Sequence, residues 1–254
     1  MNKPLITLVG NGKMALSIAH GLKESYAIEV IGRTMECLDT FEASVGTAIQ
    51  KRLYEEASCE GKTLILCVKP SNLGEISVRL QGKAKALYSV LAGTPISALH
   101  AIPAYSYVRA MPNLAAEAGA SMTSLVGDAS LQEEAVALFS SIGMTLWLGS
   151  EKELDIATAL AGSGPAYLAL IAEALCDGAV REGLKRSDAM TLMRGLFQGF
   201  GVLIQNTHPA LLKDSVMSPG GTTAAGYGAL ESAGVRQGCM EAIRLGYDKA
   251  KNIK

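Results

Sequence analysis

The first fifteen residues limit most strongly what this chain can fold into. A short apolar run, Leu5–Val9, leads without a break into a glycine-containing turn and then into a stretch with helical spacing up to Leu22. The turn consists of Gly10, Asn11, Gly12, Lys13, Met14 and Ala15. In such a turn the first glycine allows the tight bend, the second lets a pyrophosphate approach the backbone, and a small third residue lets the helix pack on the strand. The pattern predicts a dinucleotide-binding turn formed by these six residues.

Short β-rich runs alternate with helical stretches as far as residue 150. The expected strands are Leu5–Val9, Ile28–Ile31, Thr63–Val68, Leu87–Leu91, Tyr107–Ala110 and Thr145–Leu148. This alternation predicts an α/β Rossmann domain over residues 1–150, with a mostly parallel, doubly wound sheet. Ser130 and Glu133 have the spacing of a capping box, which predicts that a helix starts there.

The strand signal disappears after residue 150, which predicts an all-α domain over residues 151–254. The expected helices are Glu153–Ala161, Pro165–Glu182, Asp188–Asn206, Pro209–Met217, Thr223–Ala233 and Val235–Asn252. Residues 156–180 are apolar enough to suggest a membrane span. However, Gly162–Pro165 is expected to interrupt the run, and Glu173 and Asp177 follow, so helices buried in a core or between subunits are expected instead.

The composition points to a small-molecule partner. The net charge is −1, and the basic residues are spread thinly, which argues against nucleic acid binding. The five cysteines are far apart without CxxC spacing, which is typical of reduced thiols in a cytoplasmic protein. Met1-Asn2-Lys3 leads directly into the first strand, so no targeting segment is expected.

The end of the second expected strand favours NADP(H) as the dinucleotide. An NAD site usually has an acidic residue there, whereas this strand ends Gly32-Arg33-Thr34 with no acid after Glu29. Arg33 could bind a 2′-phosphate with its guanidinium and Thr34 with its hydroxyl. The alternative, that Arg33 is an ordinary surface charge, stays open, and NADH remains possible.

Further candidate residues lie at the ends of other expected strands, where ligands collect in open α/β sheets. Those expected at the cofactor are Cys67, Val68, Lys69, Pro70, Ala92 and Gly93. Met111 and Asn113, at the next strand end, are expected to contact the substrate.

A second glycine-containing loop, Ser218–Thr223, comes between two expected helices. Its residues are Ser218, Pro219, Gly220, Gly221, Thr222 and Thr223. Pro219 ends the previous helix, and the glycines free the backbone before the next one begins. A helix N-terminus with hydroxyls and unhindered N–H groups is suited to an anion, most simply a carboxylate.

Four motifs in order along the chain resemble the pyrroline-5-carboxylate reductase family. They are Val68-Lys69-Pro70, Met111-Pro112-Asn113, Gly162–Tyr167 and Val216–Thr223 with Leu230-Glu231. The resemblance implies reduction of the cyclic imine L-1-pyrroline-5-carboxylate to proline, the last step of proline synthesis. It also implies that Ser218 and the Gly220, Gly221 and Thr222 amides hold the substrate carboxylate. Thr223 would place its hydroxyl on the ring nitrogen as the catalytic residue.

The same resemblance implies a homo-oligomer, a dimer or a multiple of dimers, whose active sites draw on two chains. No metal is expected. A protonated imine needs an oriented nicotinamide rather than a strong acid, which agrees with the absence of an obvious catalytic histidine. His208 is expected to start a helix. Gly32, Leu114 and Asn206 depart from residues common in the family and leave the fine specificity open.

Three alternatives remain. One is another imine reductase, because activity on other cyclic imines stays open. A β-hydroxyacid dehydrogenase would need a lysine base on the helix Pro165–Glu182, which has none. A non-catalytic NADP-binding regulator would have no need for the Ser218–Thr223 loop.

Overall fold

The computed structural model describes residues 3–251 of the chain. The chain divides into two compact units, of which one comprises Met1–Pro165 with Arg244–Lys254 and the other Ala166–Ile243. The expected domains, 1–150 and 151–254, remain a prediction. Each unit has its own architecture and is described by itself.

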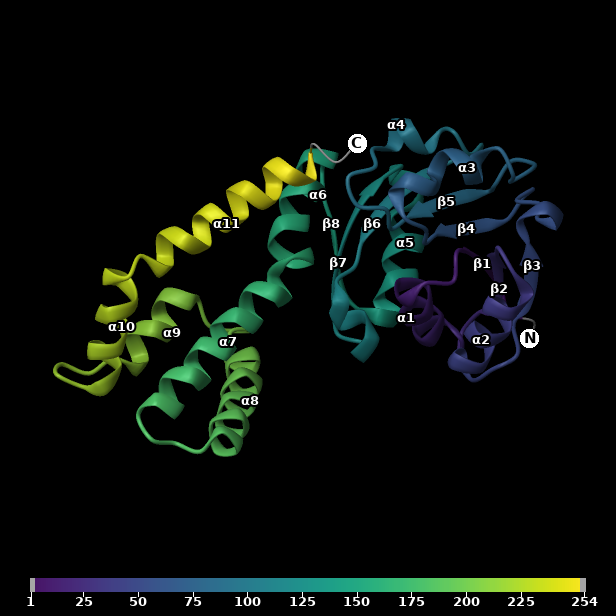
Figure 1. The fold of residues 1–254 in the computed structure, drawn as a ribbon. Helices are drawn as coiled ribbons and strands as arrows, with labels where there is room; N and C mark the ends of the chain where they lie inside the picture. Colours follow the sequence, from purple (N-terminus) through teal and green to yellow (C-terminus); the bar gives the residue numbers. More distant parts are fainter. Residues whose placement is uncertain (1–2, 252–254) are drawn as a thin grey trace. The chain divides into compact units, whose positions relative to one another are not determined.

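One eight-stranded sheet forms the centre of the first unit, in the order β3-β2-β1-β4-β5-β6-β7-β8 (Figure 1). Every neighbouring pair is parallel except β6 and β7. The chain proceeds from β1 outward to β3, then returns to β4 beside β1 and proceeds to the other edge. The strands are β1 (Leu5–Val9), β2 (Ala27–Gly32), β3 (Gln50–Leu53), β4 (Thr63–Leu66), β5 (Ala86–Ser89), β6 (Tyr107–Met111), β7 (Ser121–Gly127) and β8 (Gly143–Trp147).

Helices cover both faces of this sheet, which confirms the predicted doubly wound Rossmann fold. Adjacent residues of one strand enter different apolar clusters, because strand side chains alternate between faces. Leu8 packs in the cluster of α1 and α5, whereas Val9 packs in the cluster of α3 and α4. The helices of this unit before residue 150 are α1 (Lys13–Leu22), α2 (Met35–Val45), α3 (Leu73–Ser77), α4 (Ile96–Leu99) and α5 (Gln132–Phe139), with short 3-10 helices η1 (Tyr54–Glu56), η2 (Pro70–Asn72), η3 (Leu114–Ala118), η4 (Ala129–Leu131) and η5 (Ser140–Ile142).

Three details of this unit differ from the sequence-based expectation. β3 and β7 were not predicted, because β3 is a short, charged edge strand and β7 is rich in serine and threonine. The predicted capping box at Ser130 and Glu133 is wrong. Ser130 lies inside η4, and α5 begins after Leu131 with no side-chain cap.

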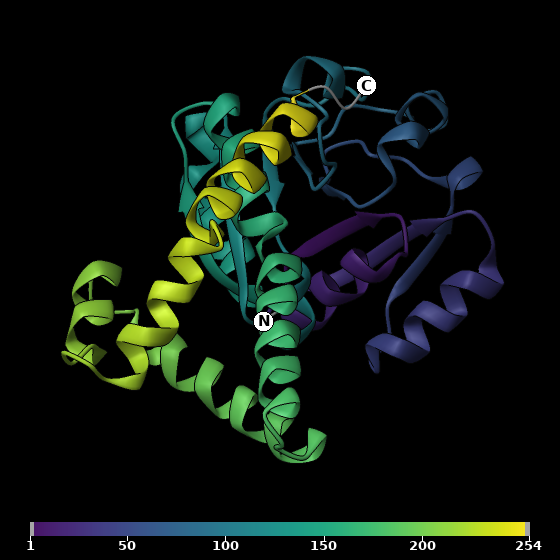
Figure 2. The ribbon, with the colours of Figure 1, turned by 60° about the vertical axis from the view of Figure 1, so that its left-hand side comes forward.

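The remaining elements are helical, as predicted for the second half of the chain. They are α6 (Glu151–Ala157), the π-helical turn η6 (Thr158–Gly162), α7 (Gly164–Arg181), α8 (Arg186–Leu203), α9 (Pro209–Val216), α10 (Thr222–Ser232) and α11 (Val235–Ala250). Figure 2 shows the helices of the second unit, from green to yellow, as separate rods joined by turns. His208 caps α9 as expected, with Nδ1 accepting from Ala210 N at 3.2 Å. The expected end of the last helix at Asn252 lies outside the described residues.

The expected break at Gly162–Pro165 is wrong, because the helix continues through it from Glu151 to Arg181. The π-helical turn absorbs the proline: Ser163 N donates to Thr158 O at 3.0 Å, and Pro165, which has no N–H to donate, falls directly after the widened turn. By length and composition the resulting 31-residue helix could cross a membrane, and only 17% of its most apolar window is buried.

The second unit leaves many large apolar side chains exposed in the single chain. Among them are Leu170, 67% exposed, and Leu192, 64% exposed. Cys176 and Ala189 are its buried apolar residues within the described part of the chain. An exposed apolar surface of this kind is typical of an interaction face, so a single chain lacks part of the environment that these helices require.

Candidate active site

The carboxyl ends of the central strands meet at one edge of the sheet, around Gly10. Its N–H donates to Ile31 O of β2 at 2.9 Å. At the end of β4, Cys67 N donates to Val9 O of β1 at 2.8 Å. Gly10 has a φ of +105°, and a Cβ there would lie 2.8 Å from both Cys67 O and Val68 Cγ1. Only glycine therefore allows the ends of β1 and β4 to approach this closely.

Gly12 differs from Gly10, because a Cβ at this position would meet no protein atom within 4 Å. It precedes the first residue of α1, Lys13, and supplies no side-chain cap for the helix N-terminus. Protein packing gives no reason for a glycine here, but an anion that approaches the first-turn N–H groups does. Ala15 is fully buried against the sheet, as its predicted role requires. The residues of this turn therefore fit a dinucleotide pyrophosphate.

Arg33 and Thr34 lie directly after β2, at the same edge. Arg33 is 59% exposed and forms an ion pair with Glu75 of α3, with Nη2 3.4 Å from Oε2. The Thr34 hydroxyl oxygen accepts from Cys37 N at 3.3 Å and so caps α2. Its O–H remains able to donate, because a hydroxyl can accept and donate at once. Both residues are placed where a group at the end of β2 could meet them.

Gly32 and Leu38 are in close contact just below this edge. A Cβ on Gly32 would lie 2.7 Å from Leu38 Cδ2, and Leu38 is fully buried. The Leu38 side chain thus fills the space that a larger residue at position 32 would need. The departure from the family pattern at Gly32 has a packing explanation in this chain.

The segment after β4 contributes Cys67, Val68, Lys69 and Pro70. Cys67 is partly buried, and the resulting loss of hydration raises the pKa of its thiol, which favours the neutral form. Val68 packs against the apolar cluster of α3 and α4, whereas Lys69 is exposed and precedes the first residue of η2. The segment therefore presents mainly uncharged surface and one exposed cation, that of Lys69.

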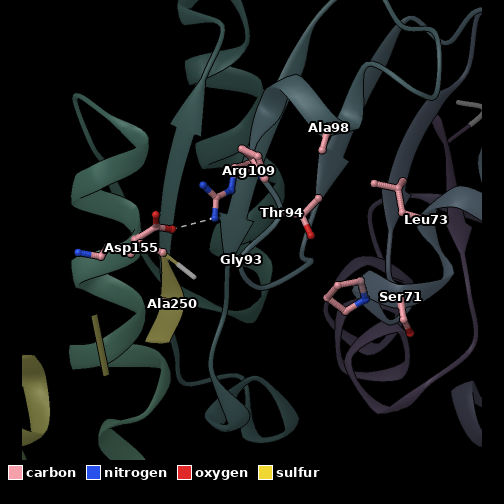
Figure 3. A pocket seen from close by; sticks show the side chains of 11 residues that line it. Ser71, Leu73, Gly93, Thr94, Ala98, Arg109, Asp155 and Ala250 are labelled. Carbon is pink, nitrogen blue, oxygen red and sulfur yellow. Dashed lines mark hydrogen bonds and ion pairs between the residues drawn. The ribbon is translucent and has the colours of Figure 1, made fainter. Parts of the chain in front are cut away.

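A cavity of about 400 Å³ opens beside this segment (Figure 3). Two predicted cofactor residues, Pro70 and Gly93, line it together with Ser71 and Thr94. Arg109 of β6 and Asp155 of α6 close it on another side, and Figure 3 shows their side chains pointing toward each other. The cavity therefore lies within the first unit and is contiguous with the predicted cofactor edge.

Arg109 links that cavity to α6 by a charge cluster in which the arginine is buried. Its Nη1 lies 2.9 Å from Glu151 Oε1 and its Nη2 lies 3.0 Å from Asp155 Oδ1. Its Nε is buried without a hydrogen-bond partner among the described residues. Glu151 Oε1 also accepts from Ile96 N at 2.9 Å, so one carboxylate joins β6, α6 and the start of α4. The turn before Ile96, which contains Gly93 and Thr94, is anchored by this link.

Met111 and Asn113 take part in the packing of the first unit. Met111 is 7% exposed and packs with Leu154. Asn113 Nδ2 donates to Ala161 O at 3.0 Å, and its Oδ1 accepts from Ala115 N at 3.1 Å. One amide hydrogen and one oxygen lone pair remain for another partner. The structure therefore gives both residues a packing role, and their predicted contact with substrate stays a prediction.

In the second unit, the loop from Ser218 to Thr223 ends at the first turn of α10. Gly220 has a φ of +71°, and Gly221 precedes the helix with no side-chain cap. A Cβ on Gly221 would overlap the Ser218 hydroxyl, so the glycine lets that hydroxyl lie against the backbone. The Thr223 side chain is exposed. Like the start of α1, this helix N-terminus has glycine where a capping side chain would otherwise stand.

Further along α10, Glu231 is held by Tyr227 and Arg236. Arg236 Nε lies 3.1 Å from both carboxylate oxygens, and the Tyr227 hydroxyl also donates to Oε1. The Arg236 and Tyr227 hydrogen bonds lower the pKa of Glu231 to about 2. This carboxylate is therefore ionised throughout the neutral range.

Sequence reasoning missed several residues around the cofactor edge. They are Glu75, Arg109, Glu151 and Asp155. A signal existed for three of them, because Arg109 interrupts an apolar strand and Glu151 and Asp155 are four residues apart on the following helix. Glu75 carried no such signal.

Comparison with known families gives matches for both parts of the chain. The family described as "NADP oxidoreductase coenzyme F420-dependent" matches residues 5–93, and "Pyrroline-5-carboxylate reductase dimerisation" matches residues 151–253. With the sheet edge described above, these matches define an NAD(P)H-dependent oxidoreductase that self-associates.

Relatives narrow this class. The chain is 36% identical to a pyrroline-5-carboxylate reductase of Synechocystis, over 97% of each chain. It is similar to the crystal structure of 1-pyrroline-5-carboxylate reductase from Streptococcus pyogenes, with a TM-score of 0.87, 29% identity and 100% of both chains covered. The Plasmodium falciparum pyrroline carboxylate reductase with NADP bound shares the fold, with a TM-score of 0.79, 24% identity, and 99% of this chain and 98% of that chain covered.

This chain belongs to the pyrroline-5-carboxylate reductase family, as its motifs predicted. Membership confirms the expected enzyme class, which acts on a C=N bond with NAD(P)H, and the expected self-association. It also gives the exposed apolar side chains of the second unit a partner, namely a second copy of the chain.

Proposed function

We propose that this enzyme reduces L-1-pyrroline-5-carboxylate to L-proline and prefers NADPH as the hydride donor. The observation that carries the proposal is the start of α10, where Gly220 and Gly221 leave the helix N-terminus without a capping side chain beside the Ser218 hydroxyl. That arrangement supplies N–H groups and a hydroxyl to a carboxylate, which every pyrroline-5-carboxylate molecule carries.

This placement supports the roles that we propose for the loop residues. Ser218 and the backbone of Gly220, Gly221 and Thr222 bind the substrate carboxylate, and the positive end of the α10 dipole stabilises its charge. Thr223, in the first turn of the same helix, places its hydroxyl at the ring nitrogen. The hydroxyl oxygen accepts the iminium N–H and so fixes the ring orientation.

The first unit binds the cofactor. Gly10–Ala15 hold the pyrophosphate on the first turn of α1, and Arg33 and Thr34 bind the 2′-phosphate. Cys67–Pro70, Ala92 and Gly93 are assigned to the nicotinamide end of the edge, and two of them, Pro70 and Gly93, line the cavity there. When bound, NADPH supplies the hydride to the imine carbon. The nitrogen keeps its proton, and the C=N double bond becomes the single bond of proline.

A Thr223 series tests the central assignment. We expect Thr223→Ala to lower imine turnover by one or more orders of magnitude while NADPH affinity stays within about twofold. Thr223→Ser keeps a hydroxyl and is expected to recover most of the turnover. Thr191→Ala is a matched control in the same unit, because the Thr191 hydroxyl donates to its own helix at Ser187 O. Normal turnover of Thr223→Ala would remove the proposed role.

Substrate comparison separates the remaining alternatives. Oxidation of NADPH and NADH is followed with pyrroline-5-carboxylate and with piperideine carboxylate. A preference for the six-membered ring would indicate a different imine reductase, and no turnover with either imine would indicate a non-catalytic NADP-binding protein.

We also place the enzyme in the cytoplasm. All five cysteines are free thiols, as expected in a reducing compartment.

A further inference from the structure

A row of four alternating charges runs along the cofactor edge, beginning at Arg33. Glu75 Oε2 lies 3.4 Å from Arg33 Nη2, and its other oxygen lies 3.2 Å from Arg79 Nη2. Arg79 Nη1 in turn lies 2.8 Å from Glu55 Oε1. Glu75 is therefore shared between two guanidinium groups, one of which is the group that would meet a 2′-phosphate.

β2 has no acidic residue at its end, and the carboxylate that pairs with Arg33 is Glu75 of α3. The acid on β2 itself, Glu29, is 1% exposed. Its carboxylate accepts from Thr7 Oγ1 and from Lys62 Nζ, each at 2.7 Å. Because those contacts occupy it inside the fold, Glu29 is unable to serve a cofactor ribose. The carboxylate that pairs with Arg33 thus comes from α3, and Arg33 is the cation proposed to recognise the phosphate.

We propose that Glu75 sets the coenzyme preference of this enzyme by competing with the 2′-phosphate for Arg33. The inference rests on the proposed role of Arg33. A carboxylate on the guanidinium both occupies its N–H donors and repels a phosphate that carries nearly two negative charges. NADH has no 2′-phosphate, so Glu75 weakens the use of NADPH selectively and brings the two coenzymes closer together in efficiency.

The exposure of the pair allows this competition. Arg33 and Glu75 are 59% and 44% exposed, and exposed ion pairs of long side chains are weak and exchange readily. A phosphate dianion can therefore displace the carboxylate, but the negative charge of Glu75 stays close by. Removing one charge at such a separation in a largely aqueous setting changes phosphate affinity by about threefold to tenfold, less at high salt.

Glu75→Gln tests the proposal, with Glu134→Gln as a matched control. The Lys85–Glu134 pair has the same 3.4 Å separation, and its side chains are 61% and 40% exposed. Lys85 directly precedes β5 and so lies at the amino ends of the parallel strands, whereas Arg33 follows β2 at the carboxyl ends. The measurements are kcat/KM for NADPH and NADH, and the affinity of 2′,5′-ADP and 5′-AMP, at low and high salt. Arg33→Gln and the double variant Arg33→Gln/Glu75→Gln complete a cycle.

We expect Glu75→Gln to raise kcat/KM for NADPH and 2′,5′-ADP affinity by about threefold to tenfold at low salt. The kcat/KM for NADH and the affinity of 5′-AMP should change less than twofold. Glu134→Gln should leave unchanged both the NADPH-to-NADH ratio of kcat/KM and the ratio of 2′,5′-ADP to 5′-AMP affinity. The gain should largely disappear in the Arg33→Gln background, because competition for Arg33 needs Arg33.

Each other outcome overturns a distinct claim. If Arg33→Gln lowers NADPH use but Glu75→Gln leaves the ratio unchanged, the Glu75 inference fails and the Arg33 assignment stands. If Arg33→Gln itself leaves the ratio unchanged, the proposed 2′-phosphate site fails and the inference with it. An equal gain in both backgrounds shows a general charge effect rather than competition for Arg33.

Discussion

Arg109 on β6 and Asp155 on α6 form an ion pair of 3.0 Å, in which only 3% of the arginine side chain is exposed. The same guanidinium holds Glu151, whose carboxylate also accepts from the backbone at Ile96. A strand of the sheet, the helix that follows it and the turn containing Gly93 are thereby fixed to one another. We infer that this cluster keeps the turn in position for the cofactor.

Arg109→Met is expected to destabilise the protein by about 3 kcal/mol. The variant leaves two carboxylates without their cation, and breaking a buried ion pair costs about 3–5 kcal/mol. Partial solvent access to Glu151 places the effect at the lower end. Lys85→Met removes a cation from an exposed pair and should cost less than about 1 kcal/mol. Urea unfolding at pH 7 measures both, and equal values for the two variants would contradict the importance of the buried cluster.

The two glycines of the first turn should respond differently to alanine. In Gly12→Ala the new Cβ meets no protein atom within 4 Å, so stability should change by less than about 1 kcal/mol. NADPH affinity should fall at least about tenfold, because the Cβ would occupy the space proposed for the pyrophosphate. Gly10→Ala has both a positive φ and an overlap with Cys67 O, and should lose stability as well as affinity.

The control for this pair is Gly74→Ala, at a helical glycine with no atom within 4 Å of the added Cβ. It should bind NADPH normally. Isothermal titration with NADPH and thermal unfolding separate the two effects. Tight NADPH binding by Gly12→Ala would contradict the assignment of this turn to the pyrophosphate.

The partly buried thiol of Cys67 provides a test by pH. Burial raises its pKa above the ordinary thiol value of about 8.5, so the thiol stays protonated at pH 8–9. Iodoacetamide should therefore modify the exposed Cys37 well before Cys67, as peptide mass mapping would show. Because the folded state retains this proton while the unfolded chain loses it, stability should decrease as the pH rises above about 8.5. Cys67→Ser should reduce that decrease, and early alkylation of Cys67 would contradict its burial.

Most of the sheet and the candidate cofactor turn could be predicted because they depend on local patterns. β1 was predicted to the residue, and β4 was recognisable because a parallel strand covered on both faces is apolar throughout. β7 broke that rule. Its buried Ser121 and Thr123 satisfy each other through their hydroxyls at 3.1 Å, a pairing that composition alone does not reveal.

The errors arose where the local sequence pattern does not decide the structure or the contacts of a residue. Pro165 is a strong local signal for a break, but a π-helical turn beginning at Thr158 lets the helix continue. Glu75 is an ordinary acidic residue in the sequence, and it becomes significant only because α3 places it beside Arg33. Arg33 itself was predictable, since its position depends only on where β2 ends.

The contact between Gly32 and Leu38 makes a single substitution at either position destabilising. A side chain gained first at position 32 would meet Leu38 Cδ2 at 2.7 Å, and overpacking of this kind costs about 1–3 kcal/mol. Shortening Leu38 first would empty a fully buried site, at about 2–5 kcal/mol. The two changes together exchange one volume for another. A side chain at position 32 is therefore expected to be tolerated best together with a smaller residue at position 38. Substitutions at the end of β2 are thus coupled to substitutions in the core beneath it.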